Sequence, residues 1–306
     1  MIKTPFALDA ASASAQPVVT LSWALFIGGG LILLLVLVMI AIAVCGPRRW
    51  RRVLAREKVI IGLGFAFPLV VLSGLLVLGL TMTAGLASSK PKPDALMITV
   101  QSEQWWWRIN YDGFETANEL VIPVGRPVRL NLVSDNVIHS FWVPQLGGKR
   151  DMIPGHSNYL NIQADKAGNF FGICSEYCGG PHALMQFRVI ALPPEQYTQW
   201  EAAQRLPANA PSGNIATRGA DNFLKLGCGV CHNIEGTLAQ GTSGPDLTHL
   251  GSRNTIGAAI LPMDEHNIAQ WTRHADTIKP NNKMPPYSYL QTGEIDDIAY
   301  YLARLK

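Results

Sequence analysis

The sequence predicts three successive parts: two membrane-spanning helices, an all-β sandwich and an all-α domain. Two long uncharged apolar stretches near the start predict the helices. Eight short runs rich in β-branched and aromatic residues predict the sandwich, and helical periodicity in the last third predicts the α domain. A chain of 306 residues is long enough for two or three modest domains.

The apolar stretches cover residues 18–45 and 59–84, and neither carries a charged side chain. Each exceeds the roughly 20 residues that a helix needs to cross a bilayer. A core helix of a soluble protein is rarely so long and so uniformly apolar. We therefore expect two transmembrane helices joined by a loop over 47–58, with a kink at Pro68 in the second helix.

The loop between the stretches holds the positive charge of the chain. It sums to +5, while residues 1–46 sum to zero and residues 90–207 and 208–306 sum to −1 each. The formal net charge of +3 is therefore no sign of nucleic-acid binding, and the positive-inside rule places the loop in the cytoplasm. Residues 1–17 then form a tail on the outer side, where the large C-terminal part also lies. The charged residues of the loop are Arg48, Arg49, Arg51, Arg52, Arg56 and Lys58, with Glu57 opposing them.

The N-terminus leaves two interpretations open. Ala13-Ser14-Ala15 is similar to a signal-peptidase site, but residues 1–8 lack the apolar core of a signal peptide. A short translocated tail and the clipped start of a longer signal peptide fit equally well.

The β part follows a polar linker that is rich in serine, lysine and proline. Its apolar runs are separated by glycine, proline and asparagine, which favour turns. Eight short strands at this spacing predict an antiparallel sandwich or barrel. The expected strands are residues 96–100, 105–111, 119–122, 128–133, 140–143, 159–163, 169–173 and 186–191.

The α part begins after a linker at residues 207–213 that is rich in proline, alanine and asparagine. Before that linker, Pro193-Pro194-Glu195 starts a helix that carries Tyr197 and Trp200. The last expected helix starts at Thr292-Gly293-Glu294 and repeats apolar residues at helical spacing, as in a capped amphipathic helix. The expected helices of this part are residues 216–226, 268–276 and 292–305.

The segment Cys174–Met185 concentrates metal-ligand chemistry. Its spacing is Cys-x3-Cys-x3-His-x2-Met, and His139 lies upstream. Thiolate and imidazole ligands suit copper or zinc, and the thioether favours copper. These five donors exceed what one blue-copper ion takes. A disulfide between Cys174 and Cys178, or a structural zinc site, would leave the histidines and the methionine unexplained.

Cys228-Gly229-Val230-Cys231-His232 is the Cys-x-x-Cys-His signature of covalent haem attachment. Two thioether bonds hold the porphyrin, and the histidine becomes an axial iron ligand. A c-type haem needs a second axial ligand further along, and Met284, which precedes a proline, fits. A redox dithiol would not need the histidine, and no second cysteine pair lies near this motif to complete a zinc site.

Other candidate ligands are weaker. Met263 lacks the Met-Pro-x-Tyr context of Met284 and is expected in the core. His249, His266 and His274 are expected to be capping or surface residues.

Taken together, these features resemble subunit II of a caa3-type cytochrome c oxidase, in which a CuA domain is followed by a fused cytochrome c. The resemblance covers nearly the whole chain, and the copper motif and Phe141-Trp142-Val143-Pro144 carry it most specifically. It implies a transmembrane hairpin over 18–87, a Greek-key cupredoxin domain over 88–206 and a class I cytochrome c domain over 207–306.

The resemblance also implies roles for the copper-motif residues. Cys174 and Cys178 would bridge the two copper ions of a dinuclear CuA centre. His139 and Met185 would complete one copper, and His182 with the Glu176 carbonyl oxygen the other. The Glu176 side chain would also reach a magnesium ion shared with subunit I.

In the second centre the resemblance implies one covalent haem c, bound through Cys228 and Cys231. His232 and Met284 would be its axial ligands. Trp105, in Gln104-Trp105-Trp106-Trp107, matches the family's residue where electrons enter CuA. For Trp106 and Trp107, the family's aromatic patch and ordinary sandwich core remain equally open.

The chain departs from the family pattern at two places. His156 stands where arginine is common, which puts the contact to the catalytic subunit in doubt. Ile61 stands where the family often has a glutamate that feeds a proton channel. Glu57, one helical turn earlier, is the candidate substitute.

The function that this resemblance implies is electron transfer in a terminal oxidase. Cytochrome c or an upstream respiratory complex would reduce the haem, and the electron would pass through CuA to haem a of subunit I. There oxygen would be reduced to water with proton pumping, since this chain has no oxygen-reducing site. The implied partners are subunits I and III in a bacterial inner membrane, with both redox domains on the periplasmic side. The alternative is the CuA subunit of a nitric oxide reductase of the same superfamily.

Overall fold

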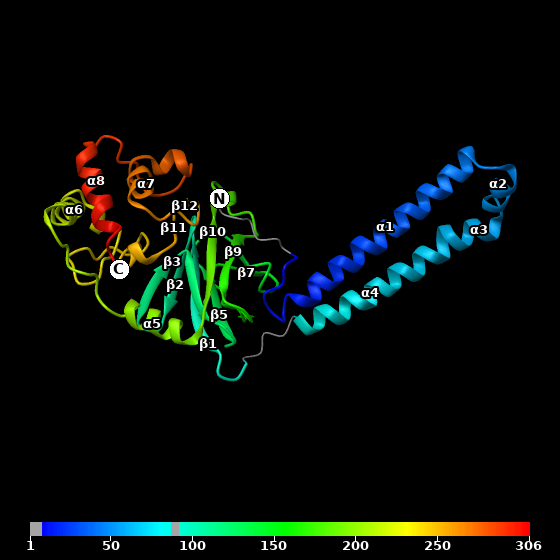
Figure 1. Cartoon of the computed structure of the whole chain (residues 1–306), viewed down its shortest axis with the longest axis horizontal. Helices are drawn as coiled ribbons and strands as arrows, with labels where there is room; N and C mark the ends of the chain where they lie inside the picture. Colours follow the sequence, from blue (N-terminus) through cyan, green and yellow to red (C-terminus); the bar gives the residue numbers. More distant parts are fainter. Residues whose placement is uncertain (1–7, 87–91) are drawn as a thin grey trace. The chain divides into compact units, whose positions relative to one another are not determined.

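The computed structural model of the protein describes residues 8–86 and 92–306, and Figure 1 gives its element order. Of the described residues, 14–86 form one compact unit. Residues 8–13 and 92–306 form the other, which contains the two candidate redox centres.

The first unit contains the two expected membrane helices. The helix α1 spans Gln16–Cys45, and a second helical stretch, Glu57–Met82, is also long and apolar enough to cross a membrane. This stretch consists of α3 (Glu57–Ile61), a π-helical turn η1 (Gly62–Ala66) and most of α4 (Phe67–Leu86). The expected loop is partly helical, because α2 spans Arg48–Leu54.

The disturbance expected at Pro68 takes the form of the π-helical turn just before it. Proline has no N–H to donate, and its ring crowds the carbonyl four residues earlier. The N–H of Phe67 bonds to the Gly62 carbonyl, five residues back, so the helix widens by one residue there. The pattern of backbone hydrogen bonds between residues four apart is thus interrupted, but the helix continues.

The β domain is built from two five-stranded sheets, in the orders β3-β2-β1-β5-β8 and β4-β10-β9-β6-β7. All eight expected strands are present. The prediction missed β3 and β7, which are only 4 and 3 residues long and carry too little pattern to be recognised alone. The strands are β1 (Leu96–Glu103), β2 (Trp106–Tyr111), β3 (Phe114–Ala117), β4 (Glu119–Pro123), β5 (Val128–Ser134), β6 (His139–Trp142), β7 (Arg150–Met152), β8 (Asn158–Ile162), β9 (Gly168–Cys174) and β10 (Gln186–Leu192).

The pairing within these sheets is mixed, so the expectation of a purely antiparallel sandwich was wrong in two places. β1 pairs with β5 in parallel, and β4 pairs with β10 in parallel. In each case the chain passes through the other sheet between the two strands. The two strands are therefore joined by a crossover and not by a hairpin, and they run in the same direction.

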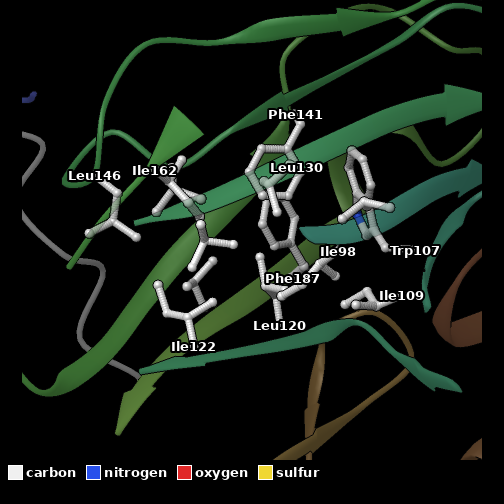
Figure 2. Close-up of a cluster of buried hydrophobic side chains, with 14 of the residues drawn as sticks. Ile98, Trp107, Ile109, Leu120, Ile122, Leu130, Phe141, Leu146, Ile162 and Phe187 are labelled. Atoms are coloured by element: carbon white, nitrogen blue, oxygen red, sulfur yellow. The ribbon is translucent and has the colours of Figure 1, made fainter. Parts of the chain in front are cut away.

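The core of the β domain lies between the two sheets, as Figure 2 shows. Along β5 the burial alternates with the period of two that one buried face requires. Trp107, Phe141 and Phe187 form its aromatic centre, with ring centroids 4.5 to 5.9 Å apart. The Trp107 ring also lies edge-on to His139 at 6.4 Å, so the core extends directly to a candidate copper ligand.

The helical part begins with α5 (Pro194–Gln204), where the sequence predicted it. Its Trp200 packs edge-on against Tyr111 and Phe114 of the β domain, with centroids 5.3 and 5.6 Å away. The Tyr111 hydroxyl donates to the Val121 carbonyl and accepts from the Val121 N–H, both at 2.8 Å.

The haem-motif domain packs α8 (Thr292–Leu302) against both α6 (Asn214–Lys225) and α7 (Glu265–Ile278). At Gly219 an added Cβ would lie 2.1 Å from a carbonyl oxygen of α8, so glycine permits this close approach. The last helix ends at Leu302 and starts with a capping box of Gln291 and Glu294. Short elements complete the domain: the 3-10 turns η3 (Cys228–Val230) and η4 (Leu250–Ser252), and the strand pair β11 (Thr255–Ile256) and β12 (Leu261–Pro262).

Candidate copper and haem centres

The candidate copper ligands meet at the ends of two paired strands. His139 opens β6 and Cys174 closes β9, and the two strands pair at Phe141 and Cys174. The loop after Cys174 returns at Met185, whose carbonyl accepts from the Cys174 N–H at 3.1 Å. Sheet pairing thus brings together donors that are 35 residues apart in the chain.

The donor atoms form a continuous cluster. The Sγ atoms of Cys174 and Cys178 are 3.8 Å apart. The Nδ1 atom of His139 lies 3.8 Å from the Cys174 sulfur, and the Nδ1 atom of His182 lies 3.4 Å from the Cys178 sulfur. The Met185 Sδ atom is 3.9 Å from the Cys178 sulfur. All five sequence-predicted donors therefore converge.

Four of the five donor residues are buried and His182 is partly exposed, and the chemistry of the cluster fits a soft metal. His139 and Met185 are fully buried, and Cys174 and Cys178 are 5% and 3% exposed. Both cysteines are free, and their sulfur separation is nearly twice the length of a disulfide bond. A hydrogen bond from the Cys178 thiol lowers the pKa of Cys174, which favours the thiolate that a metal binds.

The tautomer of His139 also fits metal binding. Its Nε2 atom lies 3.0 Å from the Asn136 side-chain oxygen, which also accepts from the Val137 N–H. Since that oxygen can only accept, the ring proton belongs on Nε2. The Nδ1 lone pair then faces Cys174, as a metal ligand requires.

Glu176 and Trp105 flank the cluster. The Glu176 carbonyl oxygen is 3.2 Å from the Cys174 sulfur, while its side chain is exposed. The Trp105 indole N–H donates to the Cys178 carbonyl at 2.9 Å. The ring lies so close to Gly180 that a Cβ there would come within 2.8 Å of it. Trp105 is thus fixed against the cysteine loop itself.

The candidate haem site is a mostly apolar cavity of about 300 Å³. Cys228, Cys231 and His232 line it together with Met284. Within residues 92–306, Met284 is the methionine that lines this cavity, whereas Met263 packs against the domain core as expected. The four residues predicted for haem binding therefore share one cavity.

His232 has the form that an iron ligand needs. Its Nδ1 atom lies 2.7 Å from the Pro245 carbonyl oxygen, an acceptor, so Nδ1 carries the proton and Nε2 keeps its lone pair. Burial lowers the pKa of His232, which keeps the ring neutral. Gly244 permits this contact, because a Cβ there would lie 2.7 Å from the imidazole. The loop that contains Gly244 and Pro245 thus orients the ring.

Met284 is held on the cavity wall by two contacts. Its N–H donates to the Asn282 side-chain oxygen at 2.8 Å. The Trp271 indole N–H points at the Met284 sulfur at 3.1 Å. The thioether is therefore oriented by its neighbours as well as by the proline that follows it.

The β domain forms part of the cavity wall, which the sequence did not predict. Trp105, Trp106 and Asn118 line the cavity along with residues of the helical domain. Trp106 therefore lines the candidate haem cavity, while Trp107 is fully buried core. Trp105 touches both centres, because the same residue bonds to the Cys178 carbonyl.

The remaining histidines and Glu57 lie apart from both centres. His156 and His266 are exposed, and His274 is half-buried on α7. His249 takes the N-cap position of η4, as one of the two expectations had it, but it is buried, and its Nε2 atom lies 3.0 Å from the Leu206 carbonyl. Glu57 is exposed in the first turn of α3.

Two further residues were missed by the sequence analysis. Glu119 and Lys279 are almost fully buried ionisable residues, 4% and 2% exposed, and both contact the opposite domain. No motif surrounds either residue, so their positions follow only from the tertiary structure.

Two family models match the chain. The model described as cytochrome c oxidase subunit II, periplasmic domain, matches residues 109–192, and the model for cytochrome c matches residues 216–306. The copper cluster lies within the first match and the haem motif within the second.

Curated relatives match both regions at once. Cytochrome c oxidase subunit 2 of Alkalihalophilus pseudofirmus is 36% identical over 246 residues, which covers 78% of this chain and 71% of the relative. The corresponding protein of Bacillus sp. strain PS3 is 34% identical over 257 residues, covering 78% and 72%. A crystal structure of the periplasmic domain of cytochrome oxidase subunit II from Bradyrhizobium japonicum is similar at 33% identity, covering 38% of this chain and 96% of that one, with a TM-score of 0.36.

Proposed function

The chain belongs to the cytochrome c oxidase subunit II family and carries a cytochrome c domain, and we propose that it passes electrons from its own haem c to a dinuclear CuA centre. The observation that carries the proposal is that Trp105 lies in the wall of the haem cavity and also bonds to the copper-loop peptide. Bound copper and haem would supply the redox chemistry, each changing by one electron. The residues of the chain hold the groups, orient them and exclude water.

The spread of the donors supports two copper ions over one. The ligand atoms of His139, Cys174 and Cys178 lie within 4.8 Å of one another. The Nδ1 atom of His182 lies 3.4 Å from the Cys178 sulfur, and the Nδ1 atom of His139 lies 3.8 Å from the Cys174 sulfur, so each imidazole approaches a different thiol. Two ions that share both thiolates would use every donor. His139 and Met185 would complete one copper, and His182 and the Glu176 carbonyl the other.

In the second centre, Cys228 and Cys231 would hold one haem c covalently. His232 would present Nε2 and Met284 its sulfur as axial ligands. A histidine–methionine pair raises the reduction potential of a haem, which suits delivery to a copper acceptor. The neutral state of His232 and the apolar cavity wall support this assignment.

The acceptor beyond CuA would be haem a of subunit I, where oxygen is reduced to water with proton pumping. The chain would lie in a bacterial inner membrane as a two-helix hairpin over residues 18–87, with 1–17 and the redox domains periplasmic. A Greek-key cupredoxin domain would occupy 88–206 and the cytochrome c domain 207–306. Subunit III, a magnesium ion at Glu176, and cytochrome c or an upstream complex as electron donor complete the proposal.

The alternative of a nitric oxide reductase subunit is not favoured. The relatives that cover both centres carry the name cytochrome c oxidase subunit 2. The haem type of the catalytic subunit that co-purifies with the chain would distinguish the two assignments.

A single substitution tests the copper assignment. Cys178→Ser removes one of two bridging thiolates, so we expect complete loss of the delocalised mixed-valence EPR signal, with haem content unchanged. Cys45→Ser, at an exposed cysteine of α1, is the matched control and should keep the signal. A Cys178→Ser protein with the parental seven-line spectrum would refute the dinuclear site.

A further inference from the structure

Glu119 is a buried carboxylate of the β domain whose hydrogen-bond partners come from the haem domain. It opens β4 and is 4% exposed. It accepts from the backbone N–H groups of Asn254 and Thr255, both at 2.9 Å. The Thr255 hydroxyl at 2.9 Å and the Asn254 side-chain amide at 3.2 Å add to these contacts.

These contacts decide whether burial of Glu119 is favourable. An ionised carboxylate out of water is costly unless its oxygens are fully hydrogen-bonded. Within its own domain Glu119 lies opposite Arg188 in the β4–β10 register. The four donor groups, however, belong to Asn254 and Thr255 alone, so these hydrogen bonds exist only while the haem domain is docked.

Lys279 makes the reverse contact, from the haem domain to the β domain. It follows α7, is 2% exposed, and its Nζ atom donates to the Trp105 carbonyl at 2.6 Å and the Gly257 carbonyl at 3.4 Å. The indole of the same Trp105 donates to the Cys178 carbonyl. One chain of contacts therefore joins the haem domain to the peptide of a copper ligand.

A third contact lies near the rim of the interface. Arg108, on β2, donates to the Thr242 carbonyl at 2.7 Å, and this contact is exposed. Exposed contacts of this kind contribute little, because water competes for both partners. The buried contacts of Glu119 and Lys279 are therefore the ones that fix how the two domains meet.

The arrangement that they fix matters for electron transfer, because tunnelling rates fall roughly exponentially with the distance between centres. Glu119 is the neighbour in sequence of Asn118, which lines the haem cavity, and Lys279 lines it directly. A loosened interface would change the separation of the two centres without altering any ligand.

We propose that Glu119 and Lys279 are positioning residues that lock the haem domain onto the β domain, with Trp105 held between the two cofactor sites. This inference rests on the proposed function. The transfer that they support moves one electron from ferrous haem to the oxidised copper centre, so the haem is oxidised as the copper is reduced.

The test uses the full chain in its purified oxidase complex, loaded with copper and haem. The variants Glu119→Gln and Lys279→Met are compared with Glu201→Gln and Lys225→Met, which alter exposed or half-exposed charges on α5 and α6. The haem is photoreduced by a flash, and its reoxidation by copper is followed optically. Pulsed EPR then measures the distribution of distances between the copper centre and oxidised haem.

We expect both interface variants to keep the parental copper EPR signal and haem spectrum. Their reoxidation should slow at least tenfold and their distance distribution should broaden, while both controls match the parent. Thr255→Val, which removes one of the donors to Glu119, should slow the transfer less. Should Glu119→Gln not accumulate, Lys279→Met and Thr255→Val carry the same test.

Parental rates and a parental distance distribution in the interface variants would overturn the inference. Absence of the copper signal or of covalent haem in the parent would instead overturn the proposed function. The two failures are therefore distinguishable by spectroscopy of the unmutated complex.

Discussion

The copper and haem centres are assembled in different ways. At the copper centre the donors touch one another, with sulfur and nitrogen atoms 3.4 to 3.9 Å apart in a mostly buried cluster at the end of a packed sandwich. At the haem centre the ligands line a large cavity around which the domain core is built. The β domain therefore forms its site by its own packing, whereas the haem domain needs its cofactor as part of the core.

This difference has a cause in the size of what is bound. Metal ions fill a gap between side chains, so strand pairing and an aromatic core suffice to bring the ligands together. A porphyrin replaces many side chains, and the apolar walls that would contact it lose those contacts without it. We expect the two domains to respond differently when a cofactor site is altered.

The largest expected effect follows from the double substitution Cys228→Ala and Cys231→Ala. Without covalent haem the cavity is left unfilled, so the haem domain should lose its stable fold, since large cavities are strongly destabilising. Limited proteolysis should then cut within residues 214–306, while the β domain and its copper signal persist. Cys45→Ala is the matched control. Equal protease resistance of both domains in the double variant would contradict the expectation that only the haem domain depends on its cofactor for folding.

A smaller effect is expected from Met284→Ala, which should leave the haem attached through its cysteines. Loss of the thioether ligand should abolish the sulfur-to-iron absorption band at the red end of the spectrum and lower the haem potential. Met263→Ala, outside the cavity, should keep the band. A retained band in Met284→Ala together with its loss in Met263→Ala would reverse the ligand assignment.

The smallest effect is expected within the β domain, from Tyr111→Phe. Removing the hydroxyl leaves the Val121 N–H and carbonyl without that partner, at a cost of about 1–3 kcal/mol in the free energy of unfolding. Denaturant unfolding followed by the copper absorption measures this cost, with Tyr289→Phe as an exposed control.

The pH dependence of the free energy of unfolding gives a second test of the Tyr111 hydroxyl. Burial raises the pKa of Tyr111 well above 10, so above pH 10 the unfolded chain loses its proton first. Folded-state stability from this group is thus present below pH 10 and declines above it. The difference between parent and Tyr111→Phe should narrow as the pH rises past 10; a constant difference would contradict the role of the buried phenol.

The sequence predicted those features that depend on local spacing. The ligands Cys174 to Met185 lie within twelve residues, and the haem motif within five, so their chemistry is readable along the chain. The eight expected strands and the helices follow from apolar periodicity for the same reason. His139 was found because its neighbours resemble a known family segment.

What the sequence could not predict depends on contacts between distant residues. The parallel pairing of β1 with β5 results from crossovers between sheets, which leave no local pattern. Trp106 could not be assigned to core or cofactor, because its cavity is completed by residues more than a hundred positions later. Glu119 and Lys279 lack any motif, since their partners belong to the other domain.

The short connection between α5 and α6 has a consequence for how the two domains stay together. Only residues 205–213 separate these helices, so the haem domain remains near its docking face at an effective concentration in the millimolar range or above. Docking through Glu119 and Lys279 therefore needs only modest intrinsic affinity to be nearly complete. Because both side chains are buried, added salt should weaken the docking far less than it weakens a complex held by surface charges. Transfer between the two centres is then a first-order event, independent of dilution, and only the delivery of electrons to the haem depends on an encounter.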